Sequence, residues 1–318
     1  MSPVFVEAPS RLHLGLIDLR GDLGRRFGGI GATLESPTVL LEARESPGLS
    51  VEGEAQEAVL RHARDFLARR GISPGVHLTV HRSIPAHVGL GSGTQLALAT
   101  ARALALLLDL DGDSPELAFR TGRGQRSAIG TWAFDRGGFL LEGGRRKDQE
   151  TPAPLLFRHV MPPEWTCLVA IPEAPRGLSG AAEEEAFRSL ASPPPELARE
   201  ISHWILMGIL PALQEGDLVA FGRGITEVQR LVGEAFLPVQ GDVFAHPRVA
   251  SVVQRLLGLG AAGAGQSSWG PAVFGLFPTR EEAERAASAL PKDLPRFVTG
   301  FRNSGARAWK GASPLPSA

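Results

Sequence analysis

The order of apolar and polar positions predicts a chain in which strands and helices alternate. In residues 11–19, leucines alternate with Arg11 and His13, which predicts a strand with one polar face. Residues 94–110 are apolar almost all round and predict a buried helix. Further strands are expected at 4–6, 39–43, 76–82, 137–144, 166–171, 272–277 and 296–301, and further helices at 54–70, 181–190, 195–214, 216–236, 246–258, 279–290 and from Ser114 onward.

Residues 145–163 interrupt this pattern. A polar run at 145–150 is followed by residues 152–163, which contain four prolines. Such a composition is typical of a linker, and we expect a domain boundary near residue 160. The prediction is an N-terminal domain over 1–160, which carries a glycine-rich loop, a C-terminal domain over 161–310, and a disordered tail over 311–318.

Composition narrows the classes of function. The chain has 318 residues, 43% of them hydrophobic, which is enough for two domains with buried cores. Its net charge of −1 is spread without basic blocks, so we expect no nucleic-acid partner and no membrane surface. The single cysteine, Cys167, is expected in the core and excludes an internal disulfide framework. Without a signal segment or an apolar run of about twenty residues, the expected location is the cytoplasm.

A glycine-rich turn over residues 84–95 precedes the apolar helix. Such a turn leaves backbone N–H groups unpaired at the positive end of a helix, where phosphate or pyrophosphate binds. It is not a dinucleotide fingerprint, because Thr94 replaces the third glycine, and it has no Walker lysine. The alternative that the glycines only allow a tight turn, without binding a ligand, stays open. The residues predicted to bind phosphate are Gly89, Leu90, Gly91, Ser92, Gly93, Thr94 and Gln95.

Three other features are candidates for chemistry. Residues 21–31 contain five glycines with Arg25 and Arg26, and they predict either a hairpin connection or a mobile loop whose guanidinium faces an anionic substrate group. Trp269 lies among small residues and is either a wall for a flat ligand or a packing residue. His77 and His81 have no third ligand nearby in the sequence, so no zinc site is assigned.

Together these motifs resemble the GHMP small-molecule kinase superfamily. Its second motif, Pro-x-x-x-Gly-Leu-Gly-Ser-Ser, is matched by residues 85–92, and its glycine-rich third motif by residues 263–271. The chain is most similar to one branch, the β-ribofuranosylaminobenzene 5'-phosphate synthases of the methanopterin pathway. That similarity lies in residues 9–19, 89–95, 129–131, 137–139 and 265–271.

The resemblance implies an α+β fold in two parts, a ribosomal S5 domain 2-like N-terminal domain and a ferredoxin-like C-terminal domain, with the active site between them. It implies a decarboxylating transferase that condenses phosphoribosyl pyrophosphate with 4-aminobenzoate or 4-hydroxybenzoate and releases carbon dioxide and pyrophosphate. Mg²⁺ bound with the pyrophosphate is the expected cofactor, without NAD or zinc. A homodimer is an expectation that the sequence itself does not settle.

The resemblance also suggests roles for single residues. Kinases of the superfamily usually have a second serine where this chain has Gly93, which favours a reaction other than phosphoryl transfer from ATP. Archaeal synthases often carry an Asp where this chain has Phe27, so no acid role is transferred there. The expected catalytic residues are Arg25 or Arg26, as partner of the benzoate carboxylate, with Arg11 and His13 in the pocket; the expected substrate-binding residues are Ser10, Gly28, Gly29, Gln266, Ser267, Ser268 and Trp269.

Two alternatives make different predictions. An ATP-dependent kinase of a small alcohol, similar to homoserine or mevalonate kinase, requires a carboxylate base near the glycine-rich loop. A non-catalytic protein that senses a sugar or phosphate would bind a ligand without releasing pyrophosphate.

Overall fold

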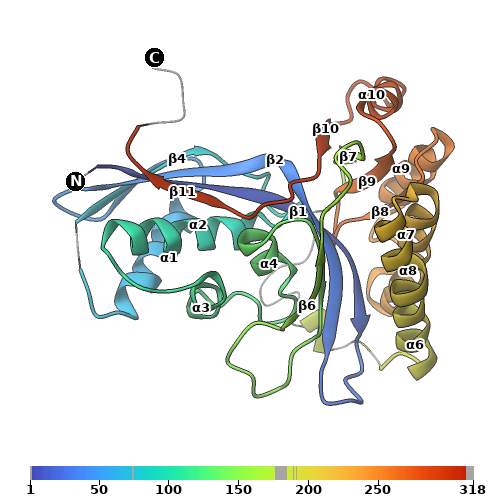
Figure 1. Cartoon of the computed structure of the whole chain (residues 1–318), viewed down its shortest axis with the longest axis horizontal. Helices are drawn as coiled ribbons and strands as arrows, with labels where there is room; N and C mark the ends of the chain where they lie inside the picture. The colour runs from blue at the N-terminus through green and yellow to red at the C-terminus, as the bar shows by residue number, and fades with distance from the viewer. Residues whose placement is uncertain (1, 74, 176–184, 189, 191, 313–318) are drawn as a thin grey trace.

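A computed structural model describes residues 2–73, 75–175, 185–188, 190 and 192–312 (Figure 1). Its first sheet is built on two long antiparallel strands, β1 (Val4–Asp18) and β2 (Phe27–Glu45). The strand order is β11-β1-β2-β4-β3, and β5 and β6 extend the sheet from β2. The other strands are β3 (Ser50–Gly53), β4 (Val76–Arg82), β5 (Phe139–Glu142), β6 (Leu155–His159) and β11 (Arg307–Lys310).

The second sheet has four antiparallel strands in the order β10-β7-β9-β8. Figure 1 shows it beside the column of helices that contains α8, while α1, α2 and α4 lie against the first sheet and α3 packs on α2 and α4. The strands of this second sheet are β7 (Thr166–Ala170), β8 (Gly263–Gln266), β9 (Val273–Phe277) and β10 (Arg296–Gly300). The helices are α1 (Gln56–Ala68), α2 (Ser92–Leu107), α3 (Ser114–Arg120), α4 (Ile129–Asp135), α6 (Pro195–His203), α7 (Leu210–Glu215), α8 (Leu218–Gln240), α9 (Pro247–Gly258) and α10 (Arg280–Ser288), with a π-helical segment (Trp204–Ile209) between α6 and α7.

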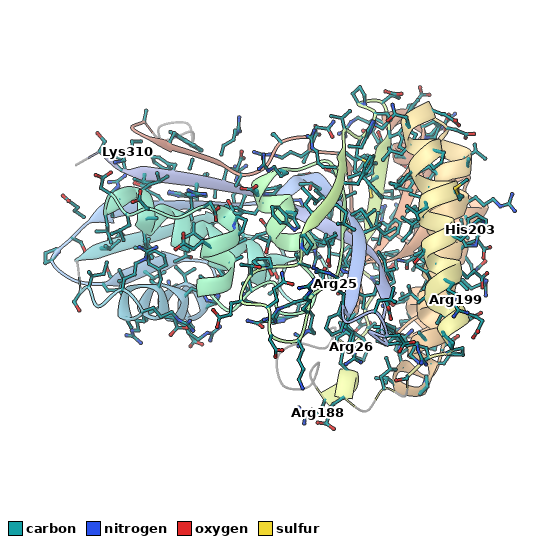
Figure 2. All side chains as sticks on the ribbon, turned by 60° about the horizontal axis from the view of Figure 1, so that its bottom comes forward. Arg25, Arg26, Arg188, Arg199, His203 and Lys310 are labelled. Carbon is teal, nitrogen blue, oxygen red and sulfur yellow. The ribbon has the colours of Figure 1, made fainter. Side chains whose placement is uncertain are left out.

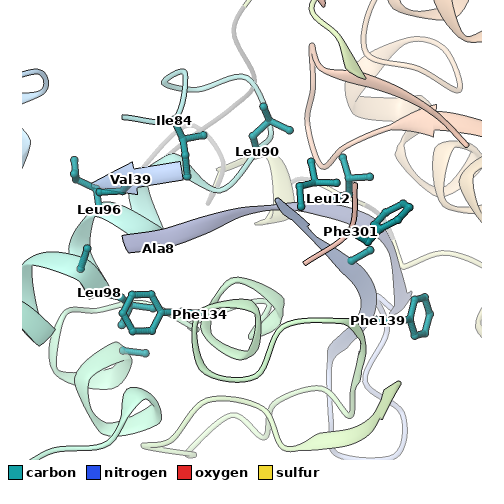
Figure 3. Packing of buried hydrophobic residues seen from close by; sticks show 14 of the residues in the cluster. Ala8, Leu12, Val39, Ile84, Leu90, Leu96, Leu98, Phe134, Phe139 and Phe301 are labelled. Carbon is teal, nitrogen blue, oxygen red and sulfur yellow. The ribbon is translucent and has the colours of Figure 1, made fainter. Parts of the chain in front are cut away.

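One hydrophobic cluster joins the two sheets. It contains Leu12 of β1, Leu98 of α2 and Phe139 of β5 (Figure 3). It continues to Phe221 of α8. Leu90 belongs to the same cluster and is fully buried, so the glycine-rich loop is fixed to the core just before α2 begins. Because the core is continuous, the space between the two sheets has rigid walls.

One prediction treated residues 21–31 as a mobile glycine-rich loop, but only the first part of this segment lies outside the strands. From Phe27 onward it is part of β2. A Cβ on Gly31 would lie 2.3 Å from Ile129 Cγ2, and one on Gly29 would lie 2.9 Å from the carbonyl oxygen of Gly15. These glycines therefore allow close packing between β2 and its neighbours. In the sequence, the same glycine pattern is compatible with a mobile loop and with a closely packed strand.

Other boundaries also differ from the predictions. The expected linker at 152–163 contains β6, which pairs with β5, and the helix expected at 195–214 is interrupted by the π-helical segment. The short strands β8 and β11 and the helix α4 were not predicted. Each has seven residues or fewer, so its conformation depends on contacts with other elements more than on its own sequence. Part of the helix expected at 181–190 lies outside the described residues.

The two sheets divide the chain between β6 and β7, but β11 returns from the C-terminal end to pair with β1. Whether 1–160 and 161–310 are separate domains stays a prediction, and of the tail only residues 311–312 are described. Cys167 is buried in β7, as expected, and burial raises the pKa of its thiol. Among the described helices, none has the length and apolar character that a membrane span requires.

Candidate active site

A cavity of about 320 Å³ opens between the two sheets. Its wall combines β1, the glycine-rich loop, the segment between α3 and α4, α8, and the end of β8. The segments meet there because β1 pairs with β2 on one side and contacts α8 on the other. The predicted site residues that line the cavity are Arg11, His13, Gly89, Gly91, Ser92, Gly93, Thr94, Gln266, Ser268 and Trp269.

The glycine-rich loop has the backbone geometry of an anion-binding turn. Gly89 and Gly91 have φ angles of 95° and 85°, and Gly91 is the N-cap of α2. The N–H groups of Thr94 and Gln95 both bond to the carbonyl of Gly91. The N–H groups of Ser92 and Gly93 precede these bonds and have no acceptor in the described chain, so they are available to a ligand at the cavity wall.

Several predicted residues lie behind the wall rather than on it. The hydroxyl of Ser267 is fully buried; it accepts a bond from the N–H of His13 at 3.0 Å and donates to the carbonyl of Gly89 at 2.7 Å. The amide of Gln95 is buried and donates to the carbonyl of Gly130 at 2.8 Å. These side chains hold the loop, β1 and the third motif together. Ser10 and Leu90 are also fully buried, and Gly28 and Gly29 lie in β2 outside the lining.

The cavity is positively charged. The guanidinium groups of Arg11, Arg123 and Arg126 line it, and its described lining includes no Asp or Glu. Arg11 donates from Nη1 to the carbonyl of Gly89 at 2.5 Å. A cavity with this charge favours a ligand that carries several negative charges.

His13 is linked to a buried carboxyl group. Its Nε2 lies 3.0 Å from the hydroxyl of Ser127, and that hydroxyl bonds to the carboxyl of Glu142 on β5. Glu142 also accepts bonds from the N–H groups of Ala128 and Gly144. Burial raises the pKa of Glu142 to about 7, whereas burial and the nearby Arg11 lower the pKa of His13 to about 3. His13 is therefore a neutral side chain at the cavity wall, held in orientation by Ser127.

One part of the cavity lining, called the aromatic end below, is formed by Trp269, Phe236 and Phe187. The ring centroid of Trp269 lies 4.9 Å from that of Phe236 and 5.6 Å from that of Phe187, both in edge-to-face contact. The guanidinium carbon of Arg126 lies 5.7 Å from the centroid of Phe187. This end offers a flat ring both apolar contact and a cation beside it.

The structure does not bring Arg25 and Arg26 to the described lining of the cavity. Figure 2 shows both near the end of the β1–β2 hairpin. Arg26 donates from Nε to the carbonyl of Leu19 at 2.7 Å, and its guanidinium carbon lies 5.2 Å from the ring centroid of Phe27. Arg25 donates from Nη1 to the carbonyl of Gly144 at 3.0 Å. Their proposed contact with a carboxylate stays a prediction.

Sequence reasoning missed much of the opposite wall. Arg123, Arg126 and Ser127 lie in a short segment between helices, and Phe236 lies on α8, far away in sequence. One signal was present, since residues 121–127 combine two glycines, two arginines and a serine, as residues 21–31 combine glycines with arginines. No comparable signal marks Phe236.

The donor groups at this site do not fit a metal ion held by the protein. Its lining offers hydroxyls from Ser92, Thr94, Ser127 and Ser268 but, among described residues, no carboxylate, which is the usual protein ligand of Mg²⁺. Elsewhere in the described chain no group of three or more His, Cys, Asp and Glu side chains could hold a metal ion. His81 bonds to Glu42 at 2.8 Å, and His77 bonds to Ser50 at 2.8 Å.

The buried titratable groups predict how stability changes with pH. The pKa values of His13 and His62 are lowered to about 3 and about 4, so between pH 6.5 and 4.5 the unfolded chain binds protons there that the folded chain does not. Glu142, raised to about 7, acts in the opposite sense, because the folded chain keeps a proton that the unfolded chain loses above about pH 4.5. From these groups, acidification from pH 6.5 to 4.5 should lower stability by about 1.4 kcal/mol per pH unit.

Glu142→Gln removes the opposing group, so we expect this slope to double, which urea unfolding at pH 6.5 and 4.5 would measure. Glu164→Gln, at an exposed carboxyl, is the matched control and should keep the wild-type slope. An equal slope in Glu142→Gln and wild type would contradict a protonated Glu142 in the folded chain.

The chain matches two domain models and is similar to two named synthases. The model of the GHMP kinases N terminal domain matches residues 57–133, and that of the GHMP kinases C terminal matches residues 209–296. A β-ribofuranosylphenol 5'-phosphate synthase of Methanothermobacter thermautotrophicus is 37% identical, with 95% of this chain and 98% of that protein covered. A synthase with the same name from Methanocaldococcus jannaschii is 32% identical, with 96% and 100% covered.

Solved structures show the same fold. A homoserine kinase from Cytophaga hutchinsonii is similar with a TM-score of 0.69 at 18% identity, over 97% of this chain and 98% of that chain. The mevalonate kinase of Methanococcus jannaschii has a TM-score of 0.69 at 17% identity, over 94% and 98%. At such identities the likeness establishes the α+β, two-part GHMP-kinase architecture and no activity.

Proposed function

The chain belongs to the family of the β-ribofuranosylphenol 5'-phosphate synthases, and we propose that it forms a carbon–carbon bond between a ribose 5-phosphate unit and an aromatic ring. The donor is phosphoribosyl pyrophosphate and the acceptor is a para-substituted benzoate. Since the relatives are named for a phenol product, the proposed acceptor is 4-hydroxybenzoate rather than 4-aminobenzoate. The product would enter tetrahydromethanopterin synthesis.

The observation that carries this proposal is a cavity whose lining combines guanidinium groups and the N–H groups of the loop with an aromatic cluster. Phosphoribosyl pyrophosphate carries several negative charges, which suit the N–H groups of Ser92 and Gly93 and the nearby guanidinium groups. A benzoate has a flat ring, which suits the aromatic face of Trp269, and one negative charge, which suits the guanidinium of Arg126 near Phe187. The two substrates would meet at the middle of the cavity, near His13.

The proposed reaction breaks one bond in each substrate and forms one carbon–carbon bond. The bond between the anomeric carbon of the ribose and the pyrophosphate oxygen breaks, and pyrophosphate leaves with the electron pair. The ring carbon that bears the carboxylate attacks the resulting oxocarbenium-like centre. The bond to the carboxyl carbon then breaks, carbon dioxide leaves, and its electron pair restores the aromatic ring. No proton is removed from carbon, so this step needs no general base.

The charges of the lining agree with that chemistry. A kinase that phosphorylates an alcohol would require a carboxylate base near the loop, but the described residues of the cavity lining include no Asp or Glu. The nearest carboxyl in this network, Glu142, reaches the cavity only through Ser127 and His13. Fixed donors at the loop would stabilise the charge that develops on the departing pyrophosphate.

Magnesium enters the proposal only as part of the substrate. Since the lining does not fit a metal held by protein ligands, Mg²⁺ would arrive bound to the pyrophosphate oxygens, and no step is assigned to it. A cytoplasmic location and a homodimer also stay predictions.

The test is turnover with defined substrates. Purified protein, Mg²⁺, phosphoribosyl pyrophosphate and carboxyl-labelled 4-hydroxybenzoate should release carbon dioxide and pyrophosphate in equal amounts. A parallel reaction with 4-aminobenzoate reports on acceptor choice, and one with ATP and homoserine or mevalonate tests kinase activity. Phosphorylation of an alcohol, or binding of phosphoribosyl pyrophosphate without pyrophosphate release, would contradict the proposal.

A further inference from the structure

The guanidinium of Arg123 has an unusual environment within the cavity wall. Its Nε atom is buried and has no hydrogen-bond partner. Its Nη2 lies 3.5 Å from Nε2 of His62 on α1, at the limit of a hydrogen bond. Among the described residues no carboxylate forms an ion pair with it.

The groups around Arg123 add to its charge rather than balance it. Burial, Arg61 and Arg126 all lower the pKa of Arg123, and burial and the two arginines Arg123 and Arg61 lower the pKa of His62 to about 4. His62 is therefore neutral at pH 7 and supplies no countercharge. An arginine keeps its proton in such a place, so a partly buried positive charge is left for a ligand to compensate.

Gly93 makes this charge accessible at the loop. A Cβ on Gly93 would lie 3.6 Å from Nη1 and 3.9 Å from Nη2 of Arg123. Any longer side chain would cover the guanidinium. With glycine in the first turn of α2, the guanidinium and the unpaired N–H groups of that turn face the same region of the cavity.

The other two arginines of the lining have different contacts. Arg11 donates to the carbonyl of Gly89 within the loop, and Arg126 lies over the ring of Phe187 at the aromatic end. We infer that Arg123, seated against Gly93, is the side chain that binds the pyrophosphate group of the substrate, and that Gly93 is required to expose it. This inference rests on the proposed function for the identity of the substrate, but not for the anion site itself.

Binding of inorganic pyrophosphate, measured by calorimetry, tests the inference directly. A charge-assisted contact is worth a factor of about 10 to 100 in affinity, so Arg123→Gln should weaken binding by that factor. The affinity of Arg123→Lys should lie between those of the wild type and Arg123→Gln, because lysine keeps the charge but lacks the planar guanidinium. Arg61→Gln is the matched control, since it removes an exposed neighbouring charge outside the lining, and should change affinity less than about threefold.

Stability separates a binding role from a structural one. Removing a positive charge that has no carboxylate partner should leave the unfolding midpoint of Arg123→Gln unchanged or higher. A lower midpoint with unchanged pyrophosphate affinity would overturn the inference, and so would equal weakening by Arg123→Gln and Arg61→Gln. If Arg123→Gln did not fold, the same criteria would apply to Arg123→Lys.

The pair with Gly93 gives a second measurement. Gly93→Ala fits the fold, because its Cβ would make only ordinary contacts, and it should weaken pyrophosphate binding in the wild-type background but not in Arg123→Gln. If the effects of Gly93→Ala and Arg123→Gln on pyrophosphate affinity were additive, Gly93 and Arg123 would not act on the same bound group. Pyrophosphate binding that depends on Arg123, in a protein without synthase turnover, would refute the proposed function and leave this site standing.

Discussion

Gly89→Ala should reduce kcat/KM by about 100-fold or more and lower the free energy of unfolding by about 3 kcal/mol. Gly89 has a φ of 95°, and a Cβ there would lie 2.1 Å from the carbonyl oxygen of Ser267. Its own carbonyl accepts bonds from Arg11 and Ser267. The substitution would therefore push apart the loop and the third motif at the point where both face the cavity.

Two variants isolate the cause of this loss. Gly216→Ala also introduces a side chain at positive φ, 72°, but has nothing within 4 Å and lies outside the cavity lining. It should cost about 1 kcal/mol of stability and leave turnover unchanged. Gly93→Ala, in the same loop without a clash, should keep the wild-type unfolding midpoint. Turnover by Gly89→Ala at the wild-type rate, measured as pyrophosphate release, would show that the loop is not fixed through this contact.

The loop could be predicted because its signal is local. Glycines at 89, 91 and 93 at the start of an apolar helix specify a turn at a helix N-terminus, and that turn is present, with positive φ angles at Gly89 and Gly91. The same argument failed at 27–31, where glycines allow β2 to pass close to Gly15 and Ile129. A glycine pattern alone cannot distinguish a strained turn from close packing, since both require a missing side chain.

The buried polar contacts were less predictable. Gln229 lies on α8, and its amide donates to the carbonyl of Leu14 at 2.5 Å and accepts from the N–H of Gln266 at 2.8 Å. Such a residue joins three segments that are far apart in sequence. Its role depends on which backbone groups the fold leaves unpaired, and no pattern along the chain records that.

The same limit explains the arginines. Arg25 and Arg26 stood out because they are adjacent and surrounded by glycines, but they bond to backbone carbonyls at the hairpin and near β5. Arg123 and Arg126 line the cavity because α3 and α4 pack against α2, a tertiary arrangement. Arg26 still contacts the site indirectly, since Phe27 beneath it lies 5.4 Å from Phe187 in the aromatic cluster.

Trp269→Ala should raise the KM for 4-hydroxybenzoate by about 10- to 100-fold, with a smaller change in the KM for phosphoribosyl pyrophosphate. The indole contributes one wall of the aromatic end and contacts both Phe187 and Phe236, so its loss removes the surface proposed to hold the ring. Trp269→Phe keeps a flat face and should recover most of the affinity. Initial rates with each substrate varied in turn would measure both constants.

The matched control is Trp309→Ala. Trp309 is also partly buried, and it stacks on Phe5 with ring centroids 5.6 Å apart, but it lies on β11 outside the cavity lining. Trp309→Ala should lower stability without changing either KM, because the contacts that it removes are with Phe5 and the carbonyl of Ala312, neither of which lines the cavity. If Trp269→Ala instead raised both KM values equally, or only lowered the unfolding midpoint as Trp309→Ala does, Trp269 would be a packing residue. The ring of the acceptor would then have to bind elsewhere in the cavity, where Phe244 is a lining phenylalanine outside this cluster.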